Sequence, residues 1–262
     1  MCGIAFYFSD SILLENNNLN LIQKSIRERG RDAESFIKIE NKALYLFHSR
    51  LSIIDLNTES NQPFYSKCKN YCITFNGEIY NFIDLKKMLY KDFKFIPRTK
   101  SDTEILLYSL IFYGVKKTLN LIDGMFAFVF LNLKLNKIFI SRDIAGEKPL
   151  YYFKENNTFC CSSTLNSFEY FPGVPKKAIS NKSLSSYLRY GYVPDDRVLL
   201  KGIKKISPGS YLEFDLNKNK YFISNYDYFT KNKISINQKN DFSSIINQSI
   251  KQRLNADVNV GC

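Results

Sequence analysis

The chain has 262 residues, 45% of them hydrophobic, with 22 Phe and 18 Tyr. This composition supports a sizeable aromatic-rich core in one large domain or two small ones, and it excludes a wholly disordered chain. The net charge of +12 is spread along the chain rather than clustered on one helix or arm, which favours a solvated surface over a nucleic-acid-binding one.

The longest uninterrupted apolar run, Met125 to Leu131, is far shorter than the roughly 20 residues of a membrane helix. The N-terminal segment has no basic region and reaches Asp10 early, which argues against a secretory signal peptide. We therefore predict a cytoplasmic protein whose partners include neither a membrane nor nucleic acid.

Short strands and short helices mix throughout the chain, which favours an α+β layered domain. In the first part we expect strands at 4–8, 43–47 and 71–75, and helices at 18–29 and from Asn81 onward. Ser101 and Glu104 have the spacing of a capping box, so they predict the start of a further helix that stops near Gly114.

The second part begins with four expected strands at 125–131, 137–141, 150–153 and 158–162, followed by a helix at 183–189 that ends at Gly191. Residues 191–240 resemble a linker with a small hairpin at 210–214 and 221–223. Residues 242–254 predict an amphipathic helix. Its expected apolar face holds Ile245, Ile246, Ser249, Ile250 and Leu254.

The cysteines give no sign of a metal site. They stand at positions 2, 68, 72, 160, 161 and 262, without a C-x-x-C pair, and the single histidine, His48, is distant from all of them in sequence. Without a secretory signal, the four central cysteines are expected to be reduced and mostly buried. They are Cys68, Cys72, Cys160 and Cys161.

Cys2 directly follows the initiator methionine, which is commonly removed before a small residue. Removal would place a thiol, with a reference pKa of about 8.5, and a free α-amine, with one of about 7.7–8.0, on the same residue. The amine could then relay the thiol's proton near neutral pH, as in N-terminal nucleophile enzymes. Met-Cys alone is a weak signal, because most cysteines serve only in packing.

Six short motifs strengthen this interpretation. They are Cys2-Gly3-Ile4, HSRLSIID at 48–55, NGEIYN at 76–81, SDTE at 101–104, DGMFAF at 123–128 and RDIAGEKPLYY at 142–152. In this order they resemble the glutaminase domain of glutamine-dependent asparagine synthetases, the class II amidotransferases, over roughly residues 2–215. The resemblance is specific because several motifs recur together, whereas Asn-Gly alone usually marks a turn. It implies the four-layer αββα sandwich of N-terminal nucleophile (Ntn) hydrolases.

Glutamine is a zwitterion with a side-chain amide, so its pocket needs a cation, an anion and an acyl-transfer centre. The resemblance assigns the cation to Arg50, whose planar guanidinium can hold the α-carboxylate with two hydrogen bonds. It assigns the anion to Asp102, which would pair with the α-ammonium group. In isolation, Arg50 would be interpreted as a surface cation and Asp102 as a charge at a helix N-terminus.

The resemblance makes Cys2 the nucleophile that attacks the side-chain amide carbon, releases ammonia and leaves a glutamyl thioester, which water hydrolyses to glutamate. It assigns oxyanion stabilisation to the side-chain amide of Asn76 and the backbone N–H of Gly77. Further residues that it places in the pocket are Leu51, Ile53 and Glu78. His48 is more plausible as a structural residue than as the base, because the α-amine of Cys2 fills that role.

Three positions depart from the family's pattern. Arg31 stands where proline is expected in the Arg-Gly-Pro-Asp loop, and Glu28 stands where histidine is usual. Phe6 occupies a position that is often glycine. These departures are expected to affect the loop over the site or the first strand, and they leave the proposed catalytic set intact.

Residues 216–262 are predicted to be a linker and the truncated opening of a synthetase domain, because 253–261 resembles the approach to that domain. The Ser-Gly-Gly-x-Asp-Ser loop that binds the pyrophosphate of ATP in the family does not occur before Cys262. No cofactor is therefore expected for the glutaminase step, with ATP and Mg²⁺ needed only by a synthetase domain. A separately encoded synthetase domain and a homo-oligomer are the two partners left open.

The predicted reaction converts glutamine and water into glutamate and ammonia, with the ammonia destined for amidation of aspartate to asparagine. Two alternatives stay open. The ammonia could serve another acceptor, such as a surface-polysaccharide sugar, or the chain could be a catalytically idle regulatory or interaction module whose last helix binds a partner.

Overall fold

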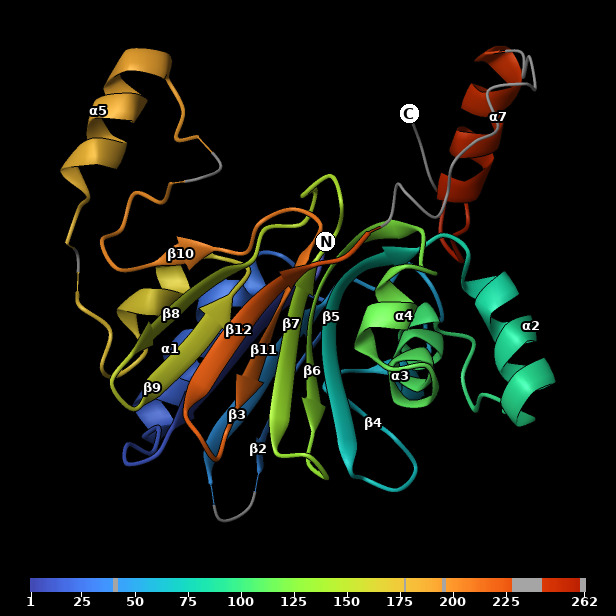
Figure 1. The fold of residues 1–262 in the computed structure, drawn as a ribbon, viewed down its shortest axis with the longest axis horizontal. Helices are drawn as coiled ribbons and strands as arrows, with labels where there is room; N and C mark the ends of the chain where they lie inside the picture. The colour runs from blue at the N-terminus through green and yellow to red at the C-terminus, as the bar shows by residue number, and fades with distance from the viewer. Residues whose placement is uncertain (40–41, 177, 195–196, 228–241, 260–262) are drawn as a thin grey trace.

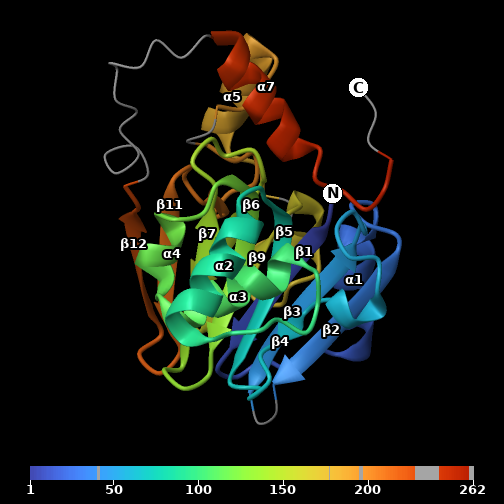
Figure 2. The same ribbon diagram turned by 90° about the vertical axis from the view of Figure 1, so that its right-hand side faces the viewer.

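Two antiparallel sheets of six strands each lie face to face in the computed structural model (Figures 1 and 2). The structure describes residues 1–39, 42–176, 178–194, 197–227 and 242–259. The first sheet has the strand order β10-β8-β9-β1-β3-β2. Its strands are β1 (Gly3–Ser9), β2 (Ala33–Ile39), β3 (Ala43–Arg50), β8 (Tyr151–Glu155), β9 (Thr158–Ser162) and β10 (Lys204–Lys205).

The second sheet has the strand order β12-β11-β7-β6-β5-β4. Its strands are β4 (Phe64–Tyr65), β5 (Tyr71–Ile79), β6 (Gly124–Asn132), β7 (Lys137–Arg142), β11 (Ser210–Asp215) and β12 (Lys220–Asn225). The β5–β6 pair is the longest ladder of this sheet and runs from Tyr71 opposite Asn132 to Ile79 opposite Gly124.

Helices cover both outer faces of the pair of sheets. Helix α1 (Asn16–Arg27) packs on β1 and β3, next to the short helix η2 (Leu165–Glu169). On the second sheet lie α2 (Phe82–Phe93), α3 (Asp102–Phe112) and α4 (Val115–Leu119). This helix–sheet–sheet–helix order confirms the predicted αββα fold.

The core follows the alternation of side chains along β1. Ile4, Phe6 and Phe8 point between the two sheets, whereas Ala5 and Tyr7 point toward α1. Both faces of the strand are therefore covered, which explains why its sequence is continuously apolar rather than alternating. A third cluster of apolar side chains fills the space between the second sheet and helices α2 to α4.

The expected strands and helices are present with ends shifted by a few residues, and β2, β4, β10 and α4 were not predicted. The capping box forms only in part. Ser101 accepts a hydrogen bond from the Thr103 amide, but Glu104 accepts from the amide and hydroxyl of Thr99 rather than from Ser101. Helix α3 ends at Phe112 with Tyr113 as its C-cap, so it stops next to Gly114, as predicted. Gly114 has a φ of 77° and is also the N-cap of α4.

His48 connects the two sheets. Its Nε2 lies 3.2 Å from the carbonyl oxygen of Phe75, so β3 of one sheet is joined to β5 of the other. The carbonyl can only accept, so Nε2 carries the proton. Burial lowers the pKa of His48 to about 3, which keeps the ring neutral. The structure therefore gives His48 a structural role, as expected.

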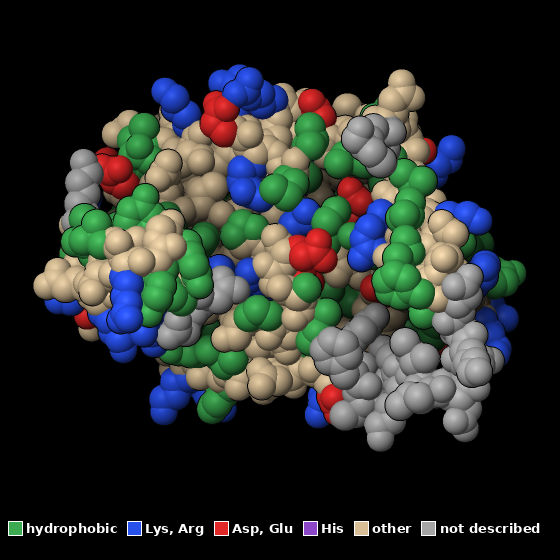
Figure 3. Space-filling view, turned by 90° about the horizontal axis from the view of Figure 1, so that it is seen from above, with side chains coloured by type: hydrophobic (Ala, Val, Ile, Leu, Met, Phe, Trp, Pro, Cys, Tyr) green, Lys and Arg blue, Asp and Glu red, His purple; other side chains and the backbone are tan. Residues whose placement is uncertain are grey.

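The predicted hairpin is present as β11 and β12, and Tyr226 beyond it is buried, with its hydroxyl donating to the Arg142 carbonyl at 2.9 Å. The predicted domain boundary after residue 215 stays a prediction, and residues 228–241 lie outside the described residues. Helix α7 (Phe242–Arg253) buries none of its side chains. Seen from above, apolar side chains gather over α5 (Asn181–Tyr190) and along α7 (Figure 3).

Among the described cysteines, Cys72, Cys160 and Cys161 are free and buried, as predicted. The expectation was wrong for Cys68, which is exposed because it lies in the tight turn between β4 and β5. Cys262 lies outside the described residues. None of the helices in the described ranges has the length and hydrophobicity that a membrane span requires.

Candidate active site

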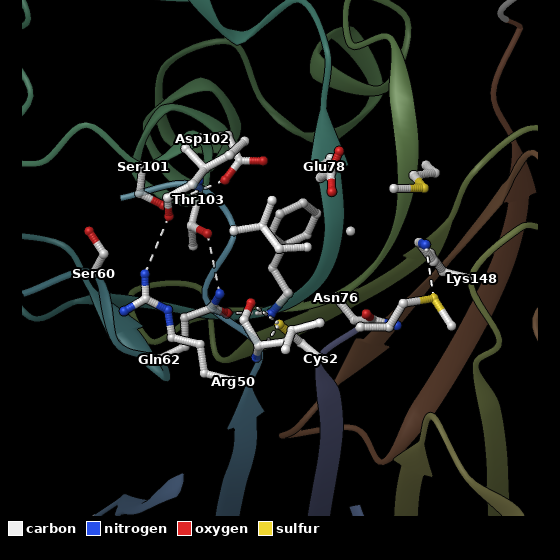
Figure 4. A pocket seen from close by; sticks show the side chains of 17 residues that line it. Cys2, Arg50, Ser60, Gln62, Asn76, Glu78, Ser101, Asp102, Thr103 and Lys148 are labelled. Atoms are coloured by element: carbon white, nitrogen blue, oxygen red, sulfur yellow. Dashed lines mark hydrogen bonds between the residues drawn. The ribbon is translucent and has the colours of Figure 1, made fainter. Parts of the chain in front are cut away.

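One pocket brings together every residue that the sequence assigned to glutamine hydrolysis (Figure 4). Its volume is about 50 Å³. It lies where the start of β1 and the end of β3 meet β5 and the first turn of α3. The predicted residues that line it are Cys2, Arg50, Leu51, Ile53, Asn76, Gly77, Glu78 and Asp102. Their functional roles stay predictions.

Cys2 precedes β1, and the β1–β3 register places it beside Arg50. Its Sγ accepts a hydrogen bond from the Leu51 amide at 3.4 Å, and its carbonyl oxygen accepts one from Arg29 Nε at 3.0 Å. Burial raises the pKa of the Cys2 thiol, although the Leu51 backbone acts in the opposite direction. The thiol is therefore protonated at neutral pH, so a nearby base is needed to activate it.

Asn76 is buried near the middle of β5 with both ends of its side-chain amide unpaired. Only 1% of the residue is exposed, and neither Nδ2 nor Oδ1 has a hydrogen-bond partner among the described residues. Leaving such a group unpaired typically costs about 1–3 kcal/mol, so buried amides are normally paired. Because Asn76 lines the pocket, its amide is available to a bound ligand, as an oxyanion donor requires.

The backbone amide of Gly77 faces the same side of β5 as two backbone amides that donate hydrogen bonds to side chains. Phe75 donates its amide to Gln62 Oε1 at 2.7 Å, and Ile79 donates to Asp102 Oδ2 at 3.0 Å. Amide directions alternate along a strand, so the Gly77 amide between them points away from β6 as well. A Cβ on Gly77 would lie 2.1 Å from a β6 carbonyl oxygen, which explains why glycine stands there.

Two acidic side chains lie across the pocket from Cys2 (Figure 4). Asp102 is the first residue of α3, and Glu78 lies in β5. Burial, together with the nearby charge of Glu78, raises the pKa of Asp102 to about 6. Burial also raises the pKa of Glu78, against the opposing effect of Lys148. This acidic wall suits an ammonium group, whose positive charge would favour the ionised carboxylates.

Arg50 ends β3 with its guanidinium directed into the loop that follows. Nη1 donates to the Asn57 carbonyl at 2.9 Å and to Asn61 Oδ1 at 2.7 Å. Nη2 donates to the carbonyl oxygens of Ile54, at 3.3 Å, and of Asp55. The four terminal N–H groups are thus bound to the loop, so the predicted two-bond grip on a carboxylate would require a rearrangement. In the described geometry, Arg50 shapes the loop that lines the pocket.

Lys148 also lines the pocket, although it was not predicted as a site residue. Its Nζ donates to Met1 Sδ at 3.0 Å, and it is 5% exposed. Burial lowers the pKa of Lys148, while the charge of Glu78 opposes that change. Lys148 belongs to the 142–152 motif, and that membership was the one signal that could have found it.

The departures from the family's pattern are accommodated locally. Glu28 and Arg31 form an ion pair with each other on the exposed surface. Phe6 is fully buried between the sheets, with its ring centroid 5.9 Å from that of Phe159. Phe6 therefore places a larger side chain in the core at the first strand. The residues of the pocket are still brought together.

The family model for the glutamine amidotransferase domain matches residues 1–227. A Methanocaldococcus jannaschii protein, named provisionally as glutamine-hydrolysing asparagine synthetase 2, is 30% identical across 100% of this chain and 54% of its own length. The glutamine-hydrolysing asparagine synthetase 1 of Bacillus subtilis is 30% identical across 86% of this chain and 36% of its own length. The chain thus spans between a third and about half of these relatives.

The solved structure of the Bacillus subtilis glutamine phosphoribosylpyrophosphate amidotransferase superposes with a TM-score of 0.62. That superposition covers 87% of this chain and 50% of the other, at 16% sequence identity, and is a likeness of fold. Together with the match over residues 1–227, it agrees with the Ntn-hydrolase sandwich expected from the sequence. The chain belongs to the class II glutamine amidotransferase family, as a glutaminase domain of the kind found in asparagine synthetases.

Proposed function

We propose that Cys2 hydrolyses the side-chain amide of glutamine in the described pocket. The thiolate attacks the amide carbon, the C–N bond breaks, and the leaving nitrogen takes up a proton and departs as ammonia. Water then attacks the glutamyl thioester, which releases glutamate and restores the thiol. The observation that carries this proposal is the unpaired Asn76 amide in a pocket that also holds the Cys2 thiol.

The surroundings of the chain start support an amine as the base. Burial lowers the pKa of the Met1 α-amine, and the cations Arg29 and Lys148 lower it further, against an opposing effect of Cys2. After removal of Met1, the amine of Cys2 would lie close to the same two cations. A lowered pKa would increase the neutral fraction of that amine near pH 7, and the neutral amine is the form that accepts the thiol's proton.

For the ammonia we propose aspartate as the acceptor, because the two relatives that match 100% and 86% of this chain are named as asparagine synthetases. Cells that express the gene and are fed glutamine labelled with ¹⁵N in its side-chain amide should place the label in asparagine. The Cys2→Ala variant is the control and should remove that labelling. Label that enters a polysaccharide sugar instead would contradict aspartate as the acceptor and leave the glutaminase step standing.

The glutaminase proposal is tested by intact-protein mass spectrometry after treatment with 6-diazo-5-oxo-norleucine, a glutamine-like electrophile. We expect one label, on Cys2, in a protein that has lost Met1. Cys68 is a matched control, because its thiol is exposed and hydrogen bonding from Ser66 lowers its pKa. Iodoacetamide should label Cys68, whereas the glutamine analogue should not. Labelling of Cys68 by the analogue, or none at Cys2, would contradict the proposal.

The pH dependence should report Asp102. Its pKa of about 6 means that the carboxyl is neutral below this pH and can no longer pair with the ammonium group of glutamine. We expect kcat/KM for glutamine to fall about tenfold per pH unit below about pH 6. Steady-state kinetics from about pH 5 to about pH 8 would measure this limb.

A substrate without the amino group separates Asp102 from other titrating groups. Glutaramate has the same side-chain amide and carboxylate as glutamine, and it offers no ammonium group for Asp102. Glutaramate should be hydrolysed with a lower kcat/KM than glutamine. Its kcat/KM should not show the fall below about pH 6 that Asp102 causes for glutamine. The same limb for both substrates would show that the thiol or its base titrates there, and the assignment to Asp102 would then be wrong.

A further inference from the structure

The segment that follows α7 returns to the pocket and binds the loop after β3. The amide of Asp55 donates to Asp257 Oδ2 at 2.7 Å, and the amide of Asp257 donates to the Ile53 carbonyl oxygen at 2.9 Å. These two hydrogen bonds join residues about 200 positions apart in the chain. Arg253, at the end of α7, adds a contact over the Tyr80 ring at 4.6 Å.

The contacted loop also shapes the glutamine pocket. Ile53 and Ile54 line that pocket, and the carbonyl oxygens of Ile54 and Asp55 accept from Arg50. Asp55 has a φ of 55°, which is uncommon for a residue with a side chain. Its carboxylate accepts from the Ser60 hydroxyl at 2.6 Å, so the bend at Asp55 is held by its own side chain and by Asp257 together.

The same segment forms a wall next to the pocket. A groove of about 630 Å³ lies between it and the loop. Four residues line both this groove and the glutamine pocket: Leu51, Ile53, Glu78 and Met125. On its other side, the groove is lined by residues of the segment and the end of α7, namely Arg253, Ala256, Val258 and Asn259. A change in how the segment lies would therefore reach the loop directly.

We propose that Asp257 is a positioning residue that holds the Ile53–Asp55 loop in the shape that binds glutamine. It does not touch the pocket, and it acts through the loop. The inference deepens the proposed glutaminase function and rests on it. The loop lines the pocket and would contact bound glutamine in the ground state and the transition state alike, so loss of Asp257 should weaken binding rather than slow the chemical step.

The test compares Asp257→Ala, Asp257→Asn and Asn255→Ala in the full chain. Asp257→Ala should raise KM for glutamine about tenfold while kcat changes little, as expected for a lost hydrogen bond to a carboxylate. Asp257→Asn keeps an acceptor oxygen and should restore most of the affinity. Asn255→Ala is the matched control in the same segment and should behave as the wild type.

Hydrogen exchange gives a second readout that does not need activity. The Asp55 amide should exchange about tenfold faster in Asp257→Ala than in the wild type, because its acceptor is lost. Unchanged exchange would overturn the contact, and faster exchange with an unchanged KM would overturn the positioning role. If the wild type hydrolyses no glutamine but its Asp55 amide is still protected from exchange, the proposed function is wrong and the contact with Asp257 is nevertheless present.

Discussion

Cys2→Ala should abolish glutaminase activity, with kcat lowered by at least about 10⁴-fold. Without the thiol no glutamyl thioester forms, and the pocket retains only groups that stabilise charge. The other lining residues are untouched, so glutamine should still bind with an affinity close to that of the wild type. Glutamate release measures the first quantity, and titration calorimetry with glutamine measures the second.

Cys68→Ala is the control for this loss, because it removes an exposed thiol outside the pocket. It should leave both glutamate release and glutamine binding unchanged. Activity that survives Cys2→Ala would require another nucleophile and would contradict the proposed mechanism. Loss of binding together with loss of activity would point to a role for Cys2 in the shape of the pocket.

The base can be tested in the same assay by blocking the removal of Met1. A peptide extension before Met1 leaves the nitrogen of Cys2 within an amide, which cannot accept the thiol's proton. Since burial raises the pKa of that thiol, the extended protein should be as inactive as Cys2→Ala. A fully active extended protein would show that another group activates the thiol.

Local sequence patterns predicted the parts of the fold that depend on local chemistry. The cap of α3 is an example, because Ser101 needs only the amides of the next turn. The reciprocal bond predicted for Glu104 does not form, and its carboxylate accepts from the amide and the hydroxyl of Thr99 instead. The edge strand β2 was not predicted, although Ile37 and Ile39 alternate with exposed neighbours, because Phe36 points outward and weakens the pattern.

Motifs predicted which residues meet in the pocket, and they could not predict how those residues are bound. Arg50 was expected to offer its guanidinium to a carboxylate, but carbonyl groups of the loop after β3 accept its hydrogen bonds, and the motif at 48–55 does not predict the path of that loop. Asp257 could not be connected with Asp55 from the sequence, because contacts across 200 residues leave no periodicity or spacing. The availability of the Gly77 amide likewise follows only from the hydrogen bonds of its neighbours.

Asn76→Ala should lower kcat about 100–1,000-fold, because one oxyanion donor contributes about 2.7–4 kcal/mol to the transition state. KM for glutamine should change little. The amide is unpaired in the described structure, and the proposed bond forms only when negative charge develops on the substrate oxygen. Loss of an interaction made only in the transition state lowers kcat and kcat/KM equally. Steady-state kinetics would measure both quantities.

The stability of the same variant distinguishes a catalytic role from a structural one. A buried amide without a partner destabilises the folded state, so its removal should leave the melting temperature unchanged or higher despite the lost activity. Asn81→Ala provides the contrast. Its amide donates to the Leu121 carbonyl at 2.8 Å and its oxygen accepts from the Asp123 amide at 2.9 Å, so this variant should lose stability. A melting temperature for Asn76→Ala that falls in parallel with its activity would mean that Asn76 supports the fold rather than the oxyanion.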